Sequence, residues 1–203
     1  IKENVDVEIV ERNSEVVKTP SNFDRSVEPM QGPTPKLNIP ASWTATLSNE
    51  MEVYGIEQTE LPLVNFSLVI DGGHLLDSFE KIGVANLMTD IMMEGTATKT
   101  PQELEEAIEM LGASIRMFTG RESITVSGNT LVRNFDKTMD LVEEILLEPR
   151  WDEKELERIK LSTVNSIKRS AANPNVVASN VRNKVLYGEK HMFAYPTSGT
   201  EEY

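Results

Sequence analysis

The sequence predicts an α+β fold in which helices cover an antiparallel-rich sheet. Segments with strand-like and helix-like periodicity follow one another in the order β-β-α-α-β-β-α-α-α, which is not the strict alternation of parallel βαβ units. Apolar residues make up 39% of the 203-residue chain and are mixed with charges of both signs, as in a globular domain. The chain has no cysteine, which excludes disulfides, zinc ribbons and thiol catalysis.

The first 42 residues differ from the rest and are predicted to be a Pro-rich interdomain linker. They hold five of the ten prolines, most of them in the stretch "PMQGPTPKLNIP". The stretch "VDVEIVERN" near the start alternates as a strand would. An extended connector on a surface and a disordered segment both fit this composition. Since the chain begins at Ile1 without a signal peptide, we expect it to be a piece of a longer protein.

The pattern becomes dense from Trp43 onward. Two strands are predicted at 45–57 and 62–73, joined by "QTEL", and the second ends in Gly-Gly. A helix over 83–95 follows, because its apolar residues recur at the spacing of one buried helix face. These apolar residues are Val84, Leu87, Met88 and Ile91.

The next helix carries signals at both of its ends. Thr100 is the predicted N-cap, Pro101 occupies the first helical position, and Glu103 completes a capping box. Gly112 stands just past the last apolar residue, where helices commonly end.

The rest of the chain is predicted to form a hairpin and three helices. The hairpin spans 114–128 and turns at Gly120 and Arg121. Asp152 and Glu155 repeat the capping-box pattern at the start of the second of these helices. The three helices are expected over residues 131–147, 152–170 and 175–187.

The charge balance excludes several classes of partner. The formal net charge is −13 and no long Lys/Arg run is present, so neither nucleic-acid binding nor a basic membrane-surface helix is expected. No segment approaches the roughly 20 apolar residues that a membrane-spanning helix needs.

Small groups of residues have simple structural explanations. His74 and His191 are each alone in a loop and are expected to be solvated rather than metal ligands. The threonines of "GTATKTP" are expected to act as helix caps, and "DEKELERIK" to form a solvated helix face with i, i+4 ion pairs. Three methionines are expected to fill the core: Met88, Met92 and Met93.

One helix face is polar and almost without charge. It carries Asn86, Thr89 and Asp90, spaced i, i+3, i+4 on the helix "GVANLMTDIMMEGT". In a chain this rich in Glu and Lys, such a face is unusual for a simple solvated surface. The i, i+3, i+4 spacing is the one at which helices place the side chains of a binding or catalytic site on one face.

Several motifs in order make residues 43–203 resemble the pitrilysin/insulinase family of zinc peptidases, which includes the mitochondrial processing peptidase. The helix "GVANLMTDIMMEGT" is similar to the family form G-x-A-H-x-x-E-H-x-x-x-x-G-T. The later "WDEKELERIKLSTVNSIKRSAANP" resembles the family's W/F-D-x-x-E-L-E-R segment, and "YGEKHMFAYPTSGTEEY" resembles its Y-G-x-x-H-P-Y-x-x-P-x-x-G-T-x-E segment. The resemblance implies the family's metallohydrolase fold, with 43–203 as the first structural repeat of one domain.

The family's zinc ligands and general base are missing from the matching positions. In an active member two histidines at i and i+4 bind zinc, and a Glu before the second one acts as general base. Here these positions hold Asn86, Thr89 and Asp90, and the family's third ligand, a Glu, is matched by Ser166 with Asn165 beside it. The resemblance therefore implies a degenerate motif, with no catalytic residue, no metal ligand and no cofactor in this segment.

The family's two-half architecture accounts for this loss. The resemblance implies that the chain belongs to the non-catalytic half of a bacterial zinc metalloendopeptidase, forms part of the peptide-binding chamber and scaffolds the catalytic half. Its expected partners are that half, fused or separate, and unfolded peptides, with zinc held by the catalytic half. Family habit suggests the periplasm or cell envelope of a Gram-negative bacterium.

Two other functions remain open at the level of sequence. The chain also resembles the non-proteolytic core proteins of respiratory complexes, which keep this fold as structural subunits. Alternatively, it is an active hydrolase that uses an unrecognised site. Peptide hydrolysis that is insensitive to chelator would distinguish the hydrolase from both inactive forms.

Overall fold

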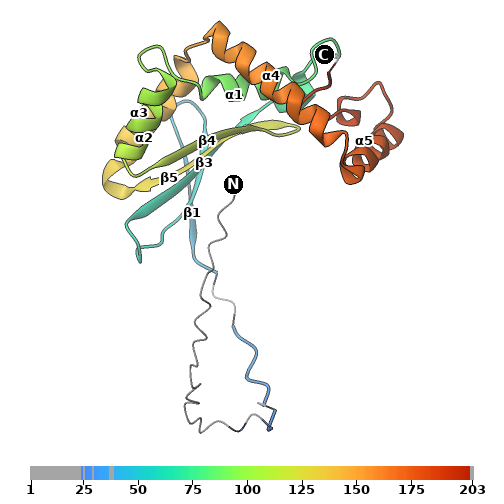
Figure 1. Ribbon diagram of the computed structural model, residues 1–203. Helices are drawn as coiled ribbons and strands as arrows, with labels where there is room; N and C mark the ends of the chain where they lie inside the picture. The colour runs from blue at the N-terminus through green and yellow to red at the C-terminus, as the bar shows by residue number, and fades with distance from the viewer. Residues whose placement is uncertain (1–23, 25, 29, 37–38, 202–203) are drawn as a thin grey trace, which may run out of the picture. The chain divides into compact units, whose positions relative to one another are not determined.

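The computed structural model describes residues 24, 26–28, 30–36 and 39–201, and the chain divides into two compact units, 1–57 and 58–203 (Figure 1). The strand predicted at "VDVEIVERN" lies outside the described residues. Residues 30–36 are exposed and have no regular secondary structure.

The first unit contains a hairpin where the sequence analysis predicts a single strand. Strand β1 (Ser42–Thr46) pairs antiparallel with β2 (Glu52–Ile56). The prediction is wrong because the turn between them contains neither Gly nor Pro: Glu50 takes a positive φ of 67°, and the Asn49 side chain accepts a bond from the Met51 amide. Across the hairpin, Trp43 lies over Gly55, where a Cβ atom would collide with the indole ring.

The second unit is built on a three-stranded antiparallel sheet in the order β3-β5-β4. Its strands are β3 (Leu63–Asp71), β4 (Ser114–Thr119) and β5 (Ser123–Leu131), and the predicted hairpin with its turn at Gly120 is confirmed. Gly128 on the central strand pairs with Phe66, and a Cβ there would lie 2.7 Å from the Phe66 ring. The glycine therefore leaves room for the Phe66 ring beside the central strand.

Helices pack on this inner face. Helix α1 (Val84–Met92) contacts both β4 and α4 (Glu153–Ser170), so α1 lies between the sheet and α4, as Figure 1 shows. Helix α2 (Pro101–Met110) packs on β4, and α3 (Phe135–Leu147) packs on β5. Helix α5 (Pro174–Tyr187) completes the set, with short 3-10 turns η1 (Gly73–Leu76), η2 (Val132–Asn134) and η3 (Met192–Ala194).

The α+β architecture with an antiparallel sheet is thus confirmed, and between residues 39 and 201 the structure has one strand more than predicted. The core joins the inner face of the sheet to α1, α2 and α3. Met92 is buried in it and Met88 and Met93 pack against it, which confirms their expected role. The buried core residues are Met92, Leu104, Ile115, Val126, Leu141, Val142 and Ile145.

The helix ends follow the predicted signals with two exceptions. The capping box of Thr100 and Glu103 is formed on both sides, and Asp152 accepts bonds from the first amides of α4. The second predicted box is incomplete because the Glu155 carboxylate accepts a bond from Arg158 instead. Helix α3 begins at Phe135 rather than residue 131, since Leu131 still belongs to β5.

Candidate functional site

The polar face of α1 divides in two in the folded protein. Asn86 is half-buried and Asp90 is exposed, and the Asn86 amide Nδ2 donates a hydrogen bond to Asp90 Oδ2 at 3.1 Å. Thr89 instead is 1% exposed and faces the sheet. The spacing of the three residues predicts a single helix face, but in the structure only Asn86 and Asp90 face away from the sheet.

Thr89 belongs to the packing between α1 and β4. Its hydroxyl donates to the carbonyl of Asn86 at 2.9 Å and lies 3.1 Å from the hydroxyl of Thr119. The Thr119 hydroxyl donates to the carbonyl of Ala85 at 2.9 Å. These contacts satisfy the Thr89 hydroxyl within the protein, so it has no catalytic geometry of its own.

Ser166 lies across from Asn86 and Asp90 and lines the same cavity. This cavity has a volume of about 570 Å³ and is bounded by α1, α4, α5 and the segment after η3. Three of the four positions matched to the zinc site are therefore brought together in space, although 76 residues separate Asp90 from Ser166. The fold thus places the degenerate positions around a common space.

The electrostatics around Asp90 are those of an unneutralised carboxylate. Asp90 is exposed as a residue, but the protein atoms around its carboxylate partly desolvate it and so raise its pKa. The charge of Glu94, one helical turn further on, raises this pKa again. Glu94 itself forms an ion pair with Arg158 of α4. Among the ion pairs of the described residues, none involves Asp90.

The residues at this position do not fit zinc. A zinc site needs nitrogen, sulfur or several carboxylate ligands in tetrahedral geometry. This cavity offers one carboxylate, two side-chain amides, serine and threonine hydroxyls and a lysine ammonium. The Thr89 hydroxyl, where an active member has its general base, is already bonded to the helix backbone. In the part of the chain that the structure describes, no three His, Cys, Asp or Glu side chains are grouped as a metal would require.

His74 is a buried structural residue, so the expectation that it is solvated is wrong. It is 1% exposed, with Nδ1 3.0 Å from Asp77 Oδ2 and Nε2 3.1 Å from the carbonyl of Met192. The Asp77 carboxylate also accepts bonds from the amides of Gly83 and Ala85. It therefore caps the start of α1, where Gly83 has no side chain to do so.

His191 is exposed, as expected for a loop residue. Its Nδ1 accepts a hydrogen bond from the amide of Phe193 and so caps η3. Neither histidine lines the cavity at Asp90.

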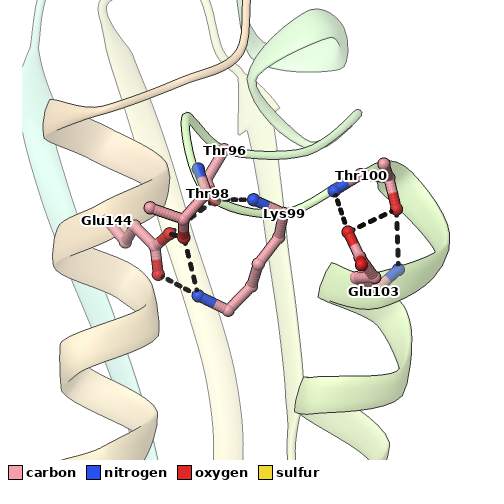
Figure 2. Close-up of polar contacts among 6 residues, drawn as sticks. All are labelled: Thr96, Thr98, Lys99, Thr100, Glu103 and Glu144. Atoms are coloured by element: carbon pink, nitrogen blue, oxygen red, sulfur yellow. Dashed lines mark hydrogen bonds and ion pairs between the residues drawn. The ribbon is translucent and has the colours of Figure 1, made fainter.

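A second polar cluster joins the loop between α1 and α2 to α3, and Figure 2 shows its contacts. The Glu144 carboxylate accepts bonds from Thr96 Oγ1 and from Lys99 Nζ, both at 2.6 Å, and from the hydroxyl of Thr98. Of the loop threonines, only Thr100 caps a helix as predicted, while Thr96 and Thr98 bind this carboxylate.

The pKa of Glu144 falls to about 2 as a result. Burial alone would raise this pKa, but the hydrogen bonds from Lys99, Thr96 and Thr98, together with the positive charge of Lys99, outweigh burial. Glu144 is thus a fully satisfied structural carboxylate.

Some lining residues escaped the sequence analysis. Asn180 and Lys184 of α5 face the same cavity, though no motif marked them, and Ser198 stands at a variable position of the quoted segment "YGEKHMFAYPTSGTEEY". Close backbone contact between Gly83 and Gly199, both with positive φ, brings this last segment against the start of α1. The glycines of these two distant motifs were the signal in the sequence for this contact.

The described residues thus form an α+β domain with helices on an antiparallel sheet, and the cavity beside α1 does not offer a zinc donor set. The family model "Insulinase (Peptidase family M16)" matches residues 52–200, which is most of the chain. The chain therefore belongs to the insulinase family of peptidases, family M16.

Individual relatives agree with this assignment. The chain is similar to the mitochondrial-processing peptidase subunit beta of Dictyostelium discoideum, with 30% identity over 90% of this chain and 37% of that protein. It is 26% identical to the uncharacterized zinc protease YmxG of Bacillus subtilis over 59% of this chain and 29% of that protein. The crystal structure of a peptidase M16 inactive domain from Pseudomonas fluorescens matches with a TM-score of 0.74 and 25% identity, covering 79% of this chain and 39% of that one.

The chain thus spans about a third of the length of the relatives it matches. No helix among the described residues is both long and apolar enough to span a membrane.

Proposed function

We propose that this chain belongs to the non-catalytic half of a zinc metallopeptidase, where it forms part of the wall of the peptide-binding chamber and scaffolds the catalytic half. The observation that carries this proposal is the arrangement of the four degenerate positions. Asn86, Asp90 and Ser166 surround a cavity with no zinc-binding donor set, and Thr89 is part of the packing against the sheet. Similarity to the inactive domain from Pseudomonas fluorescens supports the same function.

The zinc and the catalytic residues belong, in this proposal, to the other half of the peptidase, fused or separate. That half and unfolded peptides are the proposed partners. The parent protein is proposed to reside in the periplasm or cell envelope of a Gram-negative bacterium, which fractionation of the source cells with an antibody to this chain would test.

Peptide binding and cleavage by the purified chain test the proposal directly. The chain is mixed with an unfolded fluorogenic peptide, with and without one equivalent of zinc and with and without a chelator. We expect measurable peptide binding, no cleavage under any condition, and no zinc retained after gel filtration. Cleavage would indicate an active hydrolase, and absence of peptide binding would favour a purely structural subunit.

A further inference from the structure

His74 is a buried ionisable side chain that the proposed function does not use. It lies in η1, where its side chain is 1% exposed and that of Asp77, just after η1, is 2% exposed. Together the two side chains connect η1 to the start of α1 and to η3. Neither of them lines the cavity at Asp90, so the degenerate zinc positions do not account for them.

Asp77 is an acceptor at both of its carboxylate oxygens. Its Oδ2 accepts a bond from the Gly83 amide at 2.8 Å, and its Oδ1 accepts one from the Ala85 amide at 3.0 Å. Both amides belong to the start of α1, where the helix dipole favours a negative charge. Because an ionised carboxylate only accepts hydrogen bonds, a bond between Asp77 and His74 must be donated by the ring.

Both ring nitrogens of His74 face acceptors. Nδ1 lies 3.0 Å from Asp77 Oδ2, and Nε2 lies 3.1 Å from the carbonyl oxygen of Met192 in η3. A neutral imidazole carries one N–H donor, whereas an imidazolium carries two. Only the protonated ring therefore donates both bonds at once. Either neutral tautomer leaves one buried acceptor without its donor, which costs free energy.

Asp77 is the charged group that the His74 ring meets, and among the ion pairs of the described residues His74 takes part only in this one. The elements in contact with η1 are α1, β5 and η3. Strand β5 and η3 carry no charged residue, and α1 carries only Asp90, which faces the cavity. The titratable residues next to these elements are exposed or bonded elsewhere: Arg121, Glu122, His191 and Tyr195.

The bond from His74 to Met192 holds a segment that reaches the cavity. Residues 195–200 follow η3, and the backbone of Gly199 contacts that of Gly83 at the start of α1. Pro196 and Ser198 of this segment line the cavity at Asp90. The attachment of η3 to η1 therefore fixes one end of the segment that forms this wall.

We propose that protonation of His74 controls the attachment of η3 to the start of α1. The protonated ring bridges the Asp77 carboxylate and the Met192 carbonyl, and loss of one proton removes one of these two bonds. The protonated form is bound more strongly by the fold than the neutral form. The attachment is therefore strongest at acidic pH and weakens as the pH rises through the value at which His74 loses its proton.

Nuclear magnetic resonance on the full 203-residue chain tests this proposal. Long-range ¹H–¹⁵N spectra follow the protonation of the His74 ring from about pH 5 to about pH 9, around the ordinary titration range of imidazole. Hydrogen exchange of the Ala194 and Tyr195 amides, corrected for the intrinsic rate at each pH, reports the opening of η3. We expect their protection to fall about ten-fold as His74 loses its proton, or roughly 1.4 kcal/mol.

The two histidines of the chain supply matched variants. His74→Gln cannot titrate, so protection at η3 should be low and independent of pH. His191→Asn removes the exposed histidine but keeps an acceptor that can cap η3, and it should retain the pH dependence of the wild type.

The wild-type measurement decides the proposal even if His74→Gln does not fold. A His74 ring that is neutral throughout this pH range, or protection at η3 that does not follow the His74 titration, overturns it. A pH dependence that persists in His74→Gln also overturns it. None of these results bears on peptide binding, so the proposed function is tested separately.

Discussion

Two carboxylates on helices of this domain, Glu144 and Asp90, have opposite surroundings. Glu144 accepts bonds from one lysine and two threonines, and its pKa falls to about 2. Asp90 accepts a single amide bond, has no ion-pair partner among the described residues, and its pKa is raised. A carboxylate whose acceptor positions are filled stabilises the fold, whereas an exposed one without a cationic partner contributes little to stability.

The same contrast separates the Thr89 position from its neighbours on α1. Thr89 is bonded within the packing against β4, while Asn86 and Asp90 face the cavity. The positions matched to the family's zinc motif therefore have two different surroundings on one helix. One position became part of the core packing, and two remained at an open surface.

The largest expected effect is a gain of zinc binding at the cavity lined by Asn86, Asp90 and Ser166. The triple variant Asn86→His/Asp90→His/Ser166→Glu places two imidazoles one turn apart on α1 and a carboxylate across from them on α4. We expect it to retain one equivalent of zinc after gel filtration, measured by elemental analysis, where the wild type retains none. The control Asn86→His/Asp90→His lacks the third ligand and should bind more weakly. A folded triple variant without zinc would show that Ser166 does not face the α1 pair closely enough.

Removing the charge of Glu144, which binds Thr96, Thr98 and Lys99, should lower the stability of the fold. Glu144→Gln loses a charge-assisted bond to Lys99 and weakens two hydroxyl bonds, so we expect the free energy of unfolding to fall by about 2 kcal/mol. Asp90→Asn removes an unneutralised charge and should leave stability unchanged within about 0.5 kcal/mol. Urea denaturation followed by circular dichroism measures both. A larger loss in Asp90→Asn than in Glu144→Gln would reverse the comparison.

The two carboxylates should also respond to acid in opposite directions. The folded-state pKa of Glu144 lies below the ordinary value of 4.5, so its contribution is present above pH 4.5 and is lost as the pH falls towards 2. The shift corresponds to about 3 kcal/mol at most. Asp90 has a raised pKa, so its contribution is present below its ordinary value of 3.8 and is lost as the pH rises through the raised value.

Stability measured against pH in the wild type and the two single variants isolates these contributions. The gap between wild type and Glu144→Gln should narrow below pH 4.5. The gap between wild type and Asp90→Asn should change with the opposite sign. Parallel curves for wild type and Glu144→Gln would contradict the assignment of the lowered pKa.

The smallest expected effect concerns Thr89. Thr89→Val removes a buried hydroxyl that bonds the Asn86 carbonyl and approaches Thr119, and we expect a loss of about 1 kcal/mol. Thr89→Ser keeps the hydroxyl and its hydrogen bonds. Any fall in its free energy of unfolding should therefore come mainly from the missing methyl group. A double-mutant cycle with Thr119→Val should show coupling between the two positions, and an additive result would place Thr89 outside this packing.

The features that the sequence analysis predicted correctly are local. The capping box at Thr100 and Glu103, the cap at Asp152 and the turn at Gly120 each depend on residues within a few positions of one another. Hydrophobic periodicity likewise located the apolar stripe of α1, because it follows from the geometry of a single helix. Resemblance to the family extended this to Ser166, which the structure places beside Asn86 and Asp90.

The features it missed depend on distant partners or on unusual backbone. The turn at Glu50 has no Gly or Pro, so the hairpin of β1 and β2 was indistinguishable from one alternating strand. His74 is buried by contact with Met192, 118 residues away, and Thr96 binds Glu144, 48 residues away.

The amino-acid sequence by itself determined the order of the helices and of the strands after residue 62, the capping of α2 and α4, and the absence of His, Cys and Glu on α1. Only the tertiary structure decided which polar residues are satisfied and which are open. Asn86, Thr89 and Asp90 are similar in size and polarity, and their spacing does not distinguish their roles. The packing of α1 between the sheet and α4 does, because it buries Thr89 against β4 and leaves Asp90 beside a cavity.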